Sequence, residues 1–155
     1  MAALVYVAAR APDAGEDHGA LASRFPTPPA SAGLLKSPDG FTQLSEQALL
    51  HDFAGDLPLE RAEALYAVQQ RVALTLFSGR TIDAAWHSKP SWYAVSSQDR
   101  TMSPELLRFM AQRMGATTIE LHASHVSLIS HPDEIAALIL EAAGQQGLDQ
   151  TVQPG

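Results

Sequence analysis

The chain has 155 residues, of which 46% are hydrophobic and 17% charged, and this length suits a single folded domain. The formal net charge of −7 argues against binding to nucleic acid or to anionic lipid, which both attract basic proteins. The absence of cysteine excludes disulfides, thiolate metal sites and a cysteine nucleophile. It also fits a reducing compartment, and no apolar run approaches the roughly 20 residues of a membrane span, so we expect a cytoplasmic protein.

The chain opens with an unbroken apolar run, AALVYVAA at 2–9, which predicts a strand buried on both faces. No Lys or Arg precedes this run, so it is not typical of a secretory signal. A doubly buried strand needs a neighbour on each side, which predicts a place in the middle of a sheet. The segment 10–40 is rich in Pro and Gly and predicts a loop, with a helical turn near 18–24.

Two helices are predicted in the middle of the chain. Ser45 is a candidate N-cap for a short helix that ends near Phe53. Pro58 suits the first turn of a second helix over 57–74. The apolar stripe of this second helix consists of Leu65, Val68 and Val72.

The last third of the chain alternates between strands and helices. The β-forming runs SWYAVS (91–96) and TTIEL (117–121) predict strands, and a helix between them begins after the N-cap Ser103 and ends at Gly115. A final helix follows Pro132, and 145–155 is predicted to be a flexible polar tail. The predicted inward-facing residues of the two helices are Leu106, Leu107, Met110 and Met114, and Ile135, Leu138 and Ile139. This alternation predicts an α/β fold with a parallel sheet and covering helices.

Titratable residues follow both of these strands. Asp99 comes after the first, and His122 and His125 come after the second. Because adjacent parallel strands end at the same edge of a sheet, a carboxylate and an imidazole can meet there. Such a pair supplies two of the three residues of a Ser-His-Asp catalytic triad, in the chain order Asp then His. The alternatives are that Asp99 only forms a turn or a surface ion pair, and that the histidines have no chemical role.

Other residues of the sequence are also of types that can carry chemistry. His122, His125 and His131 match no tight ligand motif, so we expect neither a metal nor a cofactor. Ser124 and Ser127 flank His125 but do not lie in a strained strand-to-helix turn, so they are not expected to be nucleophiles. Trp86 and Trp92 are candidates for lining a substrate pocket, and their alternative role is packing in the core or under a cap.

Three segments carry a resemblance to a known family. They are VYVAARAPDAGE, KPSWYAVSSQDRTMSPELLRFMAQRMGA and TTIELHASHVSLISHPDEIAALILEAA. The chain resembles the C-terminal part of α/β-hydrolases, in the branch of small bacterial esterase-like proteins related to plant methylesterases and hydroxynitrile lyases. The resemblance implies a partial α/β-hydrolase fold, with three C-terminal parallel strands, covering helices and a helical cap insertion.

The resemblance also implies roles and boundaries. Asp99 in SQDR matches the triad acid, and His125 in ASHVSL matches the triad base. The related lyases carry a Lys directly after the catalytic His, and Val126 in that place favours ester hydrolysis over cyanohydrin cleavage. The implied organisation is a first strand and loop (1–30), a helical cap (31–88), a core with the acid and His loops (89–144) and the tail (145–155).

The G-x-S-x-G elbow that holds the nucleophile of such enzymes does not occur in this sequence. Several βαβ units of the family are missing as well, which amounts to on the order of 100 residues. We therefore expect the chain to be inactive by itself towards a small-molecule ester. One alternative is an interaction module that pairs with another chain or with itself through an exposed sheet edge. Another is an unrelated enzyme that uses Asp99 and His125 without a serine.

Overall fold

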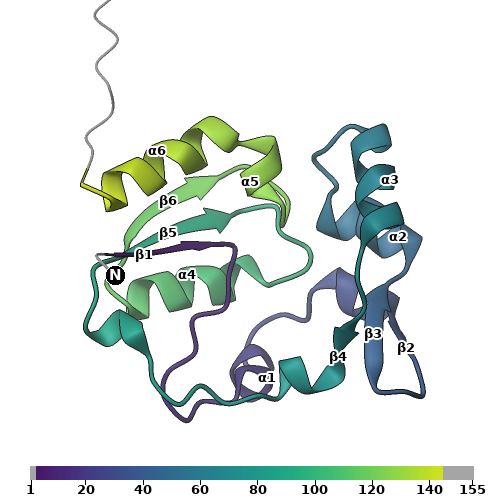
Figure 1. Ribbon diagram of the computed structural model, residues 1–155, viewed down its shortest axis with the longest axis horizontal. Coiled ribbons are helices and arrows are strands. Elements are labelled where there is room, and N and C mark those ends of the chain that lie inside the picture. The colour runs from purple at the N-terminus through teal and green to yellow at the C-terminus, as the bar shows by residue number, and fades with distance from the viewer. Residues whose placement is uncertain (1–2, 145–155) are drawn as a thin grey trace, which may run out of the picture.

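The computed structural model describes residues 3–144, and the tail expected at 145–155 lies outside these residues. Its main sheet has three parallel strands in the order β1-β5-β6 (Figure 1). Their bounds are β1 Leu4–Val7, β5 Ser91–Ser96 and β6 Thr117–Leu121. In the pairing register, Val5 lies opposite Trp92 and Ala94 opposite Ile119. The chain thus has the α/β architecture that the sequence predicts.

The central strand β5 is the buried one, because its side chains alternate between two covered faces. Tyr93 and Val95 pack with the helix α4 on one face, whereas Ala94 packs with the helix α6 on the other (Figure 1). The bounds of these helices are Pro104–Arg113 for α4 and Pro132–Ala142 for α6. A short helix, α5, spans Ser127–Ser130 before α6.

The strand β1 occupies a different place from the one predicted. Among the described strands it pairs with β5 alone, and its four residues are only partly buried. The prediction of a doubly buried strand in the middle of the sheet is therefore wrong for these residues. Their apolar run fits an edge strand that packs on both covered faces, since Tyr6 contacts one core cluster and Val5 and Val7 contact the other.

The middle of the chain forms a second layer of structure beyond the carboxyl ends of the main strands (Figure 1). It contains a small antiparallel sheet in the order β2-β3-β4, together with helices. The strands are β2 Leu34–Lys36, β3 Phe41–Leu44 and β4 Val72–Ala73. Its helices are α1 His18–Ala22, α2 Glu46–Ala48, a π-helical turn Leu49–Phe53, α3 Leu59–Val68 and 3₁₀ turns at Pro29–Gly33 and Leu74–Phe77. A further 3₁₀ turn, Ala85–His87, lies apart from this layer, beside the C-terminal end of α4, where the Arg113 guanidinium lies over the Trp86 ring. The sequence did not predict this small sheet.

Two predicted helices of this region differ in their details. The Ser45 hydroxyl caps α2 as predicted, and the helix reaches Phe53 through its π-helical turn. The second helix ends at Val68, earlier than predicted, because the side chain of Gln69 pairs with both backbone groups of Leu44. The Gln69 amide thereby mimics a neighbouring strand and leads the chain into β4.

In the last third of the chain, the helix α4 begins and ends at the residues that the sequence predicts. The Ser103 hydroxyl accepts a hydrogen bond from the N–H of Leu106, and Gly115 follows α4 with a positive φ of 62°. Within α6, Ile135 and Leu138 are buried, but Ile139 is 48% exposed, so its predicted inward position is wrong. No helix among residues 3–144 is both long and apolar enough to cross a membrane.

Candidate active site

Asp99 lies in the turn that follows β5, and its carboxylate organises this turn. The oxygen Oδ1 accepts hydrogen bonds from the backbone N–H groups of Thr101, at 2.7 Å, and Met102, at 2.9 Å. Asp and Asn form such turns readily because the side chain replaces a backbone acceptor. The residue is only 4% exposed, so its second oxygen, Oδ2, is held in a fixed direction.

His125 follows β6 and meets that second oxygen. Its Nδ1 lies 2.7 Å from Oδ2 of Asp99. A carboxylate can only accept a hydrogen bond, so Nδ1 carries the proton and Nε2 of the neutral ring keeps its lone pair. The imidazole also packs against the ring of Phe53, with 5.1 Å between the ring centroids. The sequence expectation that these two loops meet at one sheet edge is thus met by a direct contact.

The loop that carries His125 is attached to the middle of the chain. Asp56 accepts hydrogen bonds from both the backbone N–H and the hydroxyl of Ser124, and that hydroxyl lies 3.0 Å from the carbonyl oxygen of Phe53. Burial by itself raises the pKa of Asp56, but the bonds from Ser124 and Ser130 outweigh it and hold this pKa below its ordinary value. The carboxylate of Asp56 therefore holds Ser124, the residue that precedes His125, in place.

The loop that carries Asp99 is attached to the same part of the chain. Arg100 Nε donates to Oδ1 of Asp52 at 2.7 Å, and the hydroxyl of Thr101 donates to the Asp52 carbonyl at 3.2 Å. The carbonyl of Arg100 accepts a bond from the N–H of Ala30. Residues 52–56 thus contact both loops of the Asp99–His125 pair.

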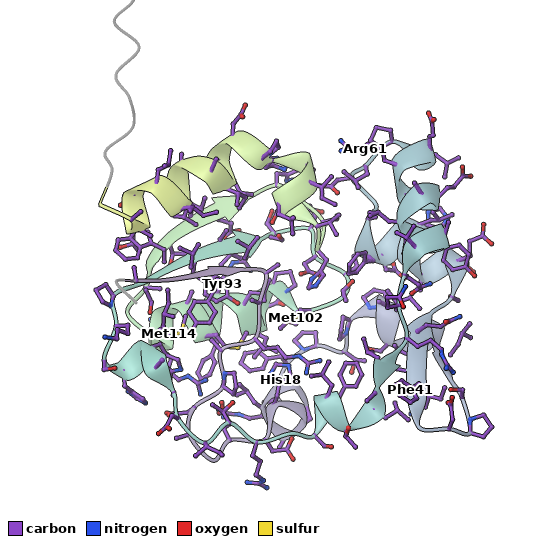
Figure 2. The ribbon with its side chains drawn as sticks, viewed as in Figure 1. His18, Phe41, Arg61, Tyr93, Met102 and Met114 are labelled. Atoms are coloured by element: carbon purple, nitrogen blue, oxygen red, sulfur yellow. The ribbon has the colours of Figure 1, made fainter. Side chains whose placement is uncertain are left out.

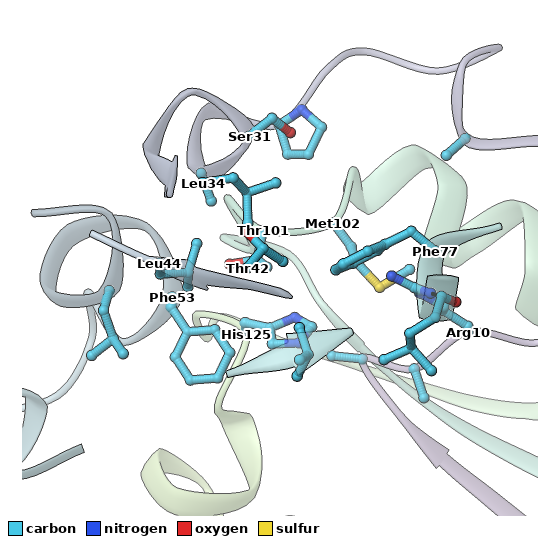
Figure 3. A pocket seen from close by; sticks show the side chains of 18 of the residues that line it. Arg10, Ser31, Leu34, Thr42, Leu44, Phe53, Phe77, Thr101, Met102 and His125 are labelled. Carbon is cyan, nitrogen blue, oxygen red and sulfur yellow. Dashed lines mark hydrogen bonds between the residues drawn. The ribbon is translucent and has the colours of Figure 1, made fainter. Parts of the chain in front are cut away.

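A cavity of about 830 Å³ opens beside His125 and lies between the main sheet and the middle segment (Figure 3). This volume is in the range of small-molecule sites, which are mostly apolar with a few polar groups. Its polar lining includes Arg10, His18 and His125. Its apolar lining includes Leu34, Leu44, Phe53, Leu65, Phe77 and Met102.

The two tryptophans named from the sequence do not line this cavity. The Nε1 of Trp86 donates to the carbonyl of Pro12, and this ring is buried under the guanidinium of Arg113. The Nε1 of Trp92 donates to Glu141 on α6. Both indoles therefore contribute to packing, and their predicted place in a substrate pocket stays a prediction.

The other histidines lie apart from the pair. His122 is exposed, and His131 contacts the hydroxyl of the adjacent Ser130. Among residues 3–144, no group of three or more His, Asp or Glu side chains is arranged to hold a metal ion. No hydroxyl group in this part of the chain is hydrogen-bonded to Nε2 of His125.

Sequence reasoning did not identify four residues of the site. Asp52 and Asp56 act on loops that lie 48 and 68 residues away in the chain, and such pairs leave no local signal. Arg10 and His18 lie in the segment that was predicted to be a loop. Their position just beyond the carboxyl end of a predicted strand is the signal that could have found them.

Comparison with known protein families gives one match that covers most of the chain. The family model described as the alpha/beta hydrolase family matches residues 1–138. The comparison with curated protein sequences found no match.

Solved structures share the fold with this chain. Polyneuridine aldehyde esterase is 15% identical, with a TM-score of 0.73 over 92% of this chain and 62% of its own. A pyrethroid hydrolase is 18% identical, with a TM-score of 0.71 over 93% and 61%. An extracellular α/β-hydrolase from a Paenibacillus species is 19% identical, with a TM-score of 0.65 over 89% and 60%. The chain thus spans about six-tenths of the length of each of these proteins.

Proposed function

Because the chain belongs to the α/β-hydrolase family, we propose that Asp99 and His125 are the acid and the base of the Ser-His-Asp triad of an esterase-like hydrolase. The observation that carries this proposal is the 2.7 Å contact between Nδ1 of His125 and Oδ2 of Asp99. It gives the imidazole the tautomer that a general base needs, with a lone pair on Nε2. The cavity beside the ring supplies a place for an ester.

In this mechanism, Nε2 of His125 takes the proton of a serine hydroxyl as that oxygen attacks the ester carbonyl. Asp99 keeps the ring oriented and stabilises the imidazolium that forms. The imidazolium then gives its proton to the departing alcohol, and a water molecule later releases the acyl group by the same route. Val126, directly after His125, leaves the reaction without the lysine of the related lyases and favours ester hydrolysis.

The serine and the oxyanion hole are supplied, in this proposal, by a polypeptide segment other than these 155 residues. The sequence has no G-x-S-x-G elbow, and the chain covers about six-tenths of the length of its structural relatives. Removing both the nucleophile and the oxyanion donors removes nearly all of the rate enhancement. The chain by itself is therefore proposed to be inactive.

Residues 31–88 act as the cap of this hydrolase. The proposal is supported by the cavity lining, because Leu34, Leu44 and Phe53 of this segment face the same space as His125 (Figure 3). A lining this apolar favours an ester with a hydrocarbon acyl or alcohol group.

The tautomer of His125 provides the first test. Nitrogen-15 NMR of the wild-type chain at neutral pH is expected to show the proton on Nδ1, and Asp99→Asn is expected to move it to Nε2, since an amide can donate to Nδ1. Asp83→Asn, at an exposed position, is the matched control and leaves the tautomer unchanged. A wild-type ring protonated on Nε2 would contradict the proposed role of Asp99.

Activity provides the second test. With p-nitrophenyl acetate, the chain alone is expected to give the background rate of hydrolysis. Turnover above background that is lost in Asp99→Asn or His125→Ala would show that the chain carries its own nucleophile or acts without one, and would contradict the proposed division of the triad.

A second candidate function is that of a pairing module of hydrolase ancestry. The observation that favours it is the free edge of β1, which pairs with β5 alone among the described strands. Unpaired backbone groups at such an edge attract another strand. Size-exclusion chromatography tests this candidate, which requires association that grows with concentration. A monomer throughout the micromolar range would rule against self-association.

A further inference from the structure

The pocket that holds His125 also carries a guanidinium. Arg10 follows β1, three positions beyond Val7, and so leaves the sheet at the same edge as the Asp99 and His125 loops. Figure 3 shows Arg10 and Phe77 on one side of the cavity, and His125 and Phe53 on the other. The pocket therefore has a base at one end and a cation at the other.

The charge of Arg10 has no counterion in the part of the chain that the structure describes. Its guanidinium lies over the ring of Phe77, 4.7 Å from the centroid, and Nη1 donates to the carbonyl of Leu76 at 3.2 Å. The ion pairs among residues 3–144 involve other cations, which are Arg71, Arg100, Arg108, Arg113, His87 and His125. Burial lowers the pKa of Arg10, and a partly buried cation is normally paired with an anion.

His18 adds a second unpaired group in the same place. It lines the same cavity, is only 8% exposed, and its buried Nδ1 has no hydrogen-bond partner among the described residues. Burial and the nearby charge of Arg10 lower the pKa of His18 to about 4. The ring is therefore neutral at physiological pH, so it can offer an N–H to a ligand without repelling Arg10.

The backbone that presents Arg10 is held in an unusual conformation. Ala8 has a φ of 43°, in the left-handed region, while its N–H donates to the carbonyl of Ala94. The hydroxyl of Tyr93 donates to the carbonyl of Ala9. A non-glycine residue keeps such a conformation only where its surroundings fix it, and strain of this kind is concentrated at functional sites. Arg10 is thus fixed before any ligand binds.

From these observations we propose that Arg10 and His18 form a carboxylate-binding subsite. In combination with the proposed esterase function, on which this point rests, the subsite selects esters that carry a carboxylate at the end away from the ester bond. A monoester of a dicarboxylic acid has this chemistry. The forked guanidinium matches a carboxylate through two parallel hydrogen bonds, and the apolar lining accommodates a methylene chain between the two ends.

Binding to the full chain tests the subsite without any need for catalysis. Monomethyl adipate carries the carboxylate, and dimethyl adipate has the same chain without the charge. Titration of each into the protein, followed by amide NMR, is expected to show about tenfold or more tighter binding of the anionic ester. Equal affinity for the two esters in the wild-type protein would contradict the proposal.

Two variants with the same change of charge locate the effect. Arg10→Gln is expected to abolish the preference for the anionic ester. Arg61→Gln, at an exposed position on α3 that lies away from His18 in Figure 2, is expected to keep it. A preference that survives Arg10→Gln would place the anion elsewhere and overturn the proposal.

Two further variants keep the test valid if Arg10→Gln fails to fold. Arg10→Lys keeps the charge but not the fork and is expected to weaken the preference several-fold, and His18→Asn is expected to weaken it with Arg10 intact. An unchanged preference in both would also contradict the subsite. The tautomer of His125 is measured independently, so failure of the subsite and failure of the triad assignment give different results.

Discussion

The carboxylate of Asp56 receives both the N–H and the hydroxyl of Ser124, the residue that precedes His125. The direction of the imidazole thus depends on a residue 68 positions away from Ser124 in the chain. Asp99 fixes one nitrogen of the ring, and Asp56 fixes the backbone that carries it.

Replacement of Asp56 tests this dependence. Asp56→Asn is expected to cost about 1 kcal/mol at pH 7, since Asp56 is exposed and solvent screens its bonds. The ring signals of His125 are expected to broaden.

The folded pKa of Asp56 is lowered, so its contribution is present at neutral pH and is lost as the pH falls below about 4. Urea denaturation at pH 7 and pH 3 measures both effects, with Glu63→Gln as an exposed control; equal losses at the two pH values would speak against this role.

The hydroxyl of Tyr93 holds the end of β1 through the carbonyl of Ala9. Tyr93→Phe leaves that acceptor without its donor, and we expect a loss of about 1–2 kcal/mol in the free energy of unfolding. Tyr66→Phe is the matched control, because the Tyr66 hydroxyl makes no hydrogen bond among the described residues. Chemical denaturation measures both variants. A Tyr93→Phe protein as stable as Tyr66→Phe would show that this bond does not stabilise β1.

The low pKa of His18 predicts a dependence of stability on pH. Its value is about 4 in the folded chain and 6.5 in the unfolded chain, so the unfolded state binds the proton first. The folded state therefore loses stability as the pH falls from about 6.5 towards 4, and nothing changes above that window. His18→Asn removes this titration. The difference in stability between the two proteins, measured at pH 7.5 and pH 5, is expected to shift in favour of the variant at the lower pH; a constant difference would contradict the prediction.

Gly33 allows the 3₁₀ turn Pro29–Gly33 to approach α2. A Cβ at this position would clash with the Cβ of Ala48 and lie 2.9 Å from Oγ of Ser45, the N-cap of that helix. Gly33→Ala is therefore expected to destabilise the fold by about 1–3 kcal/mol. At Gly79 the added Cβ would have ordinary contacts, so Gly79→Ala is the control. Thermal unfolding distinguishes the two, and equal midpoints would contradict the clash.

The helices and the contact between Asp99 and His125 could be predicted because their signals are local or topological. The N-cap Ser103 and the positive φ of Gly115 bound α4 as their residue types suggest. The contact between Asp99 and His125 follows from the rule that neighbouring parallel strands end at one edge.

The remainder depends on contacts that the sequence does not encode locally. The small sheet consists of short, partly exposed strands, and its last strand follows Gln69, whose amide pairs with Leu44 across 25 positions. Trp86 is of a residue type that often lines pockets, but its Nε1–H donates a hydrogen bond to the carbonyl of Pro12, 74 positions away. Such tertiary partners override the local pattern.

The π-helical turn at Leu49–Phe53 joins the segment that covers the pocket to both loops beneath it. Outward swinging of this turn would break the Arg100–Asp52 ion pair and release the Phe53 carbonyl from Ser124 in the same movement. Opening of the cavity at this turn would therefore remove two contacts that hold the Asp99 and His125 loops in place while a ligand enters. A ligand that enters from the opposite side of the cavity, past Arg10 and Phe77, leaves both of these contacts intact and meets the guanidinium before the imidazole of His125.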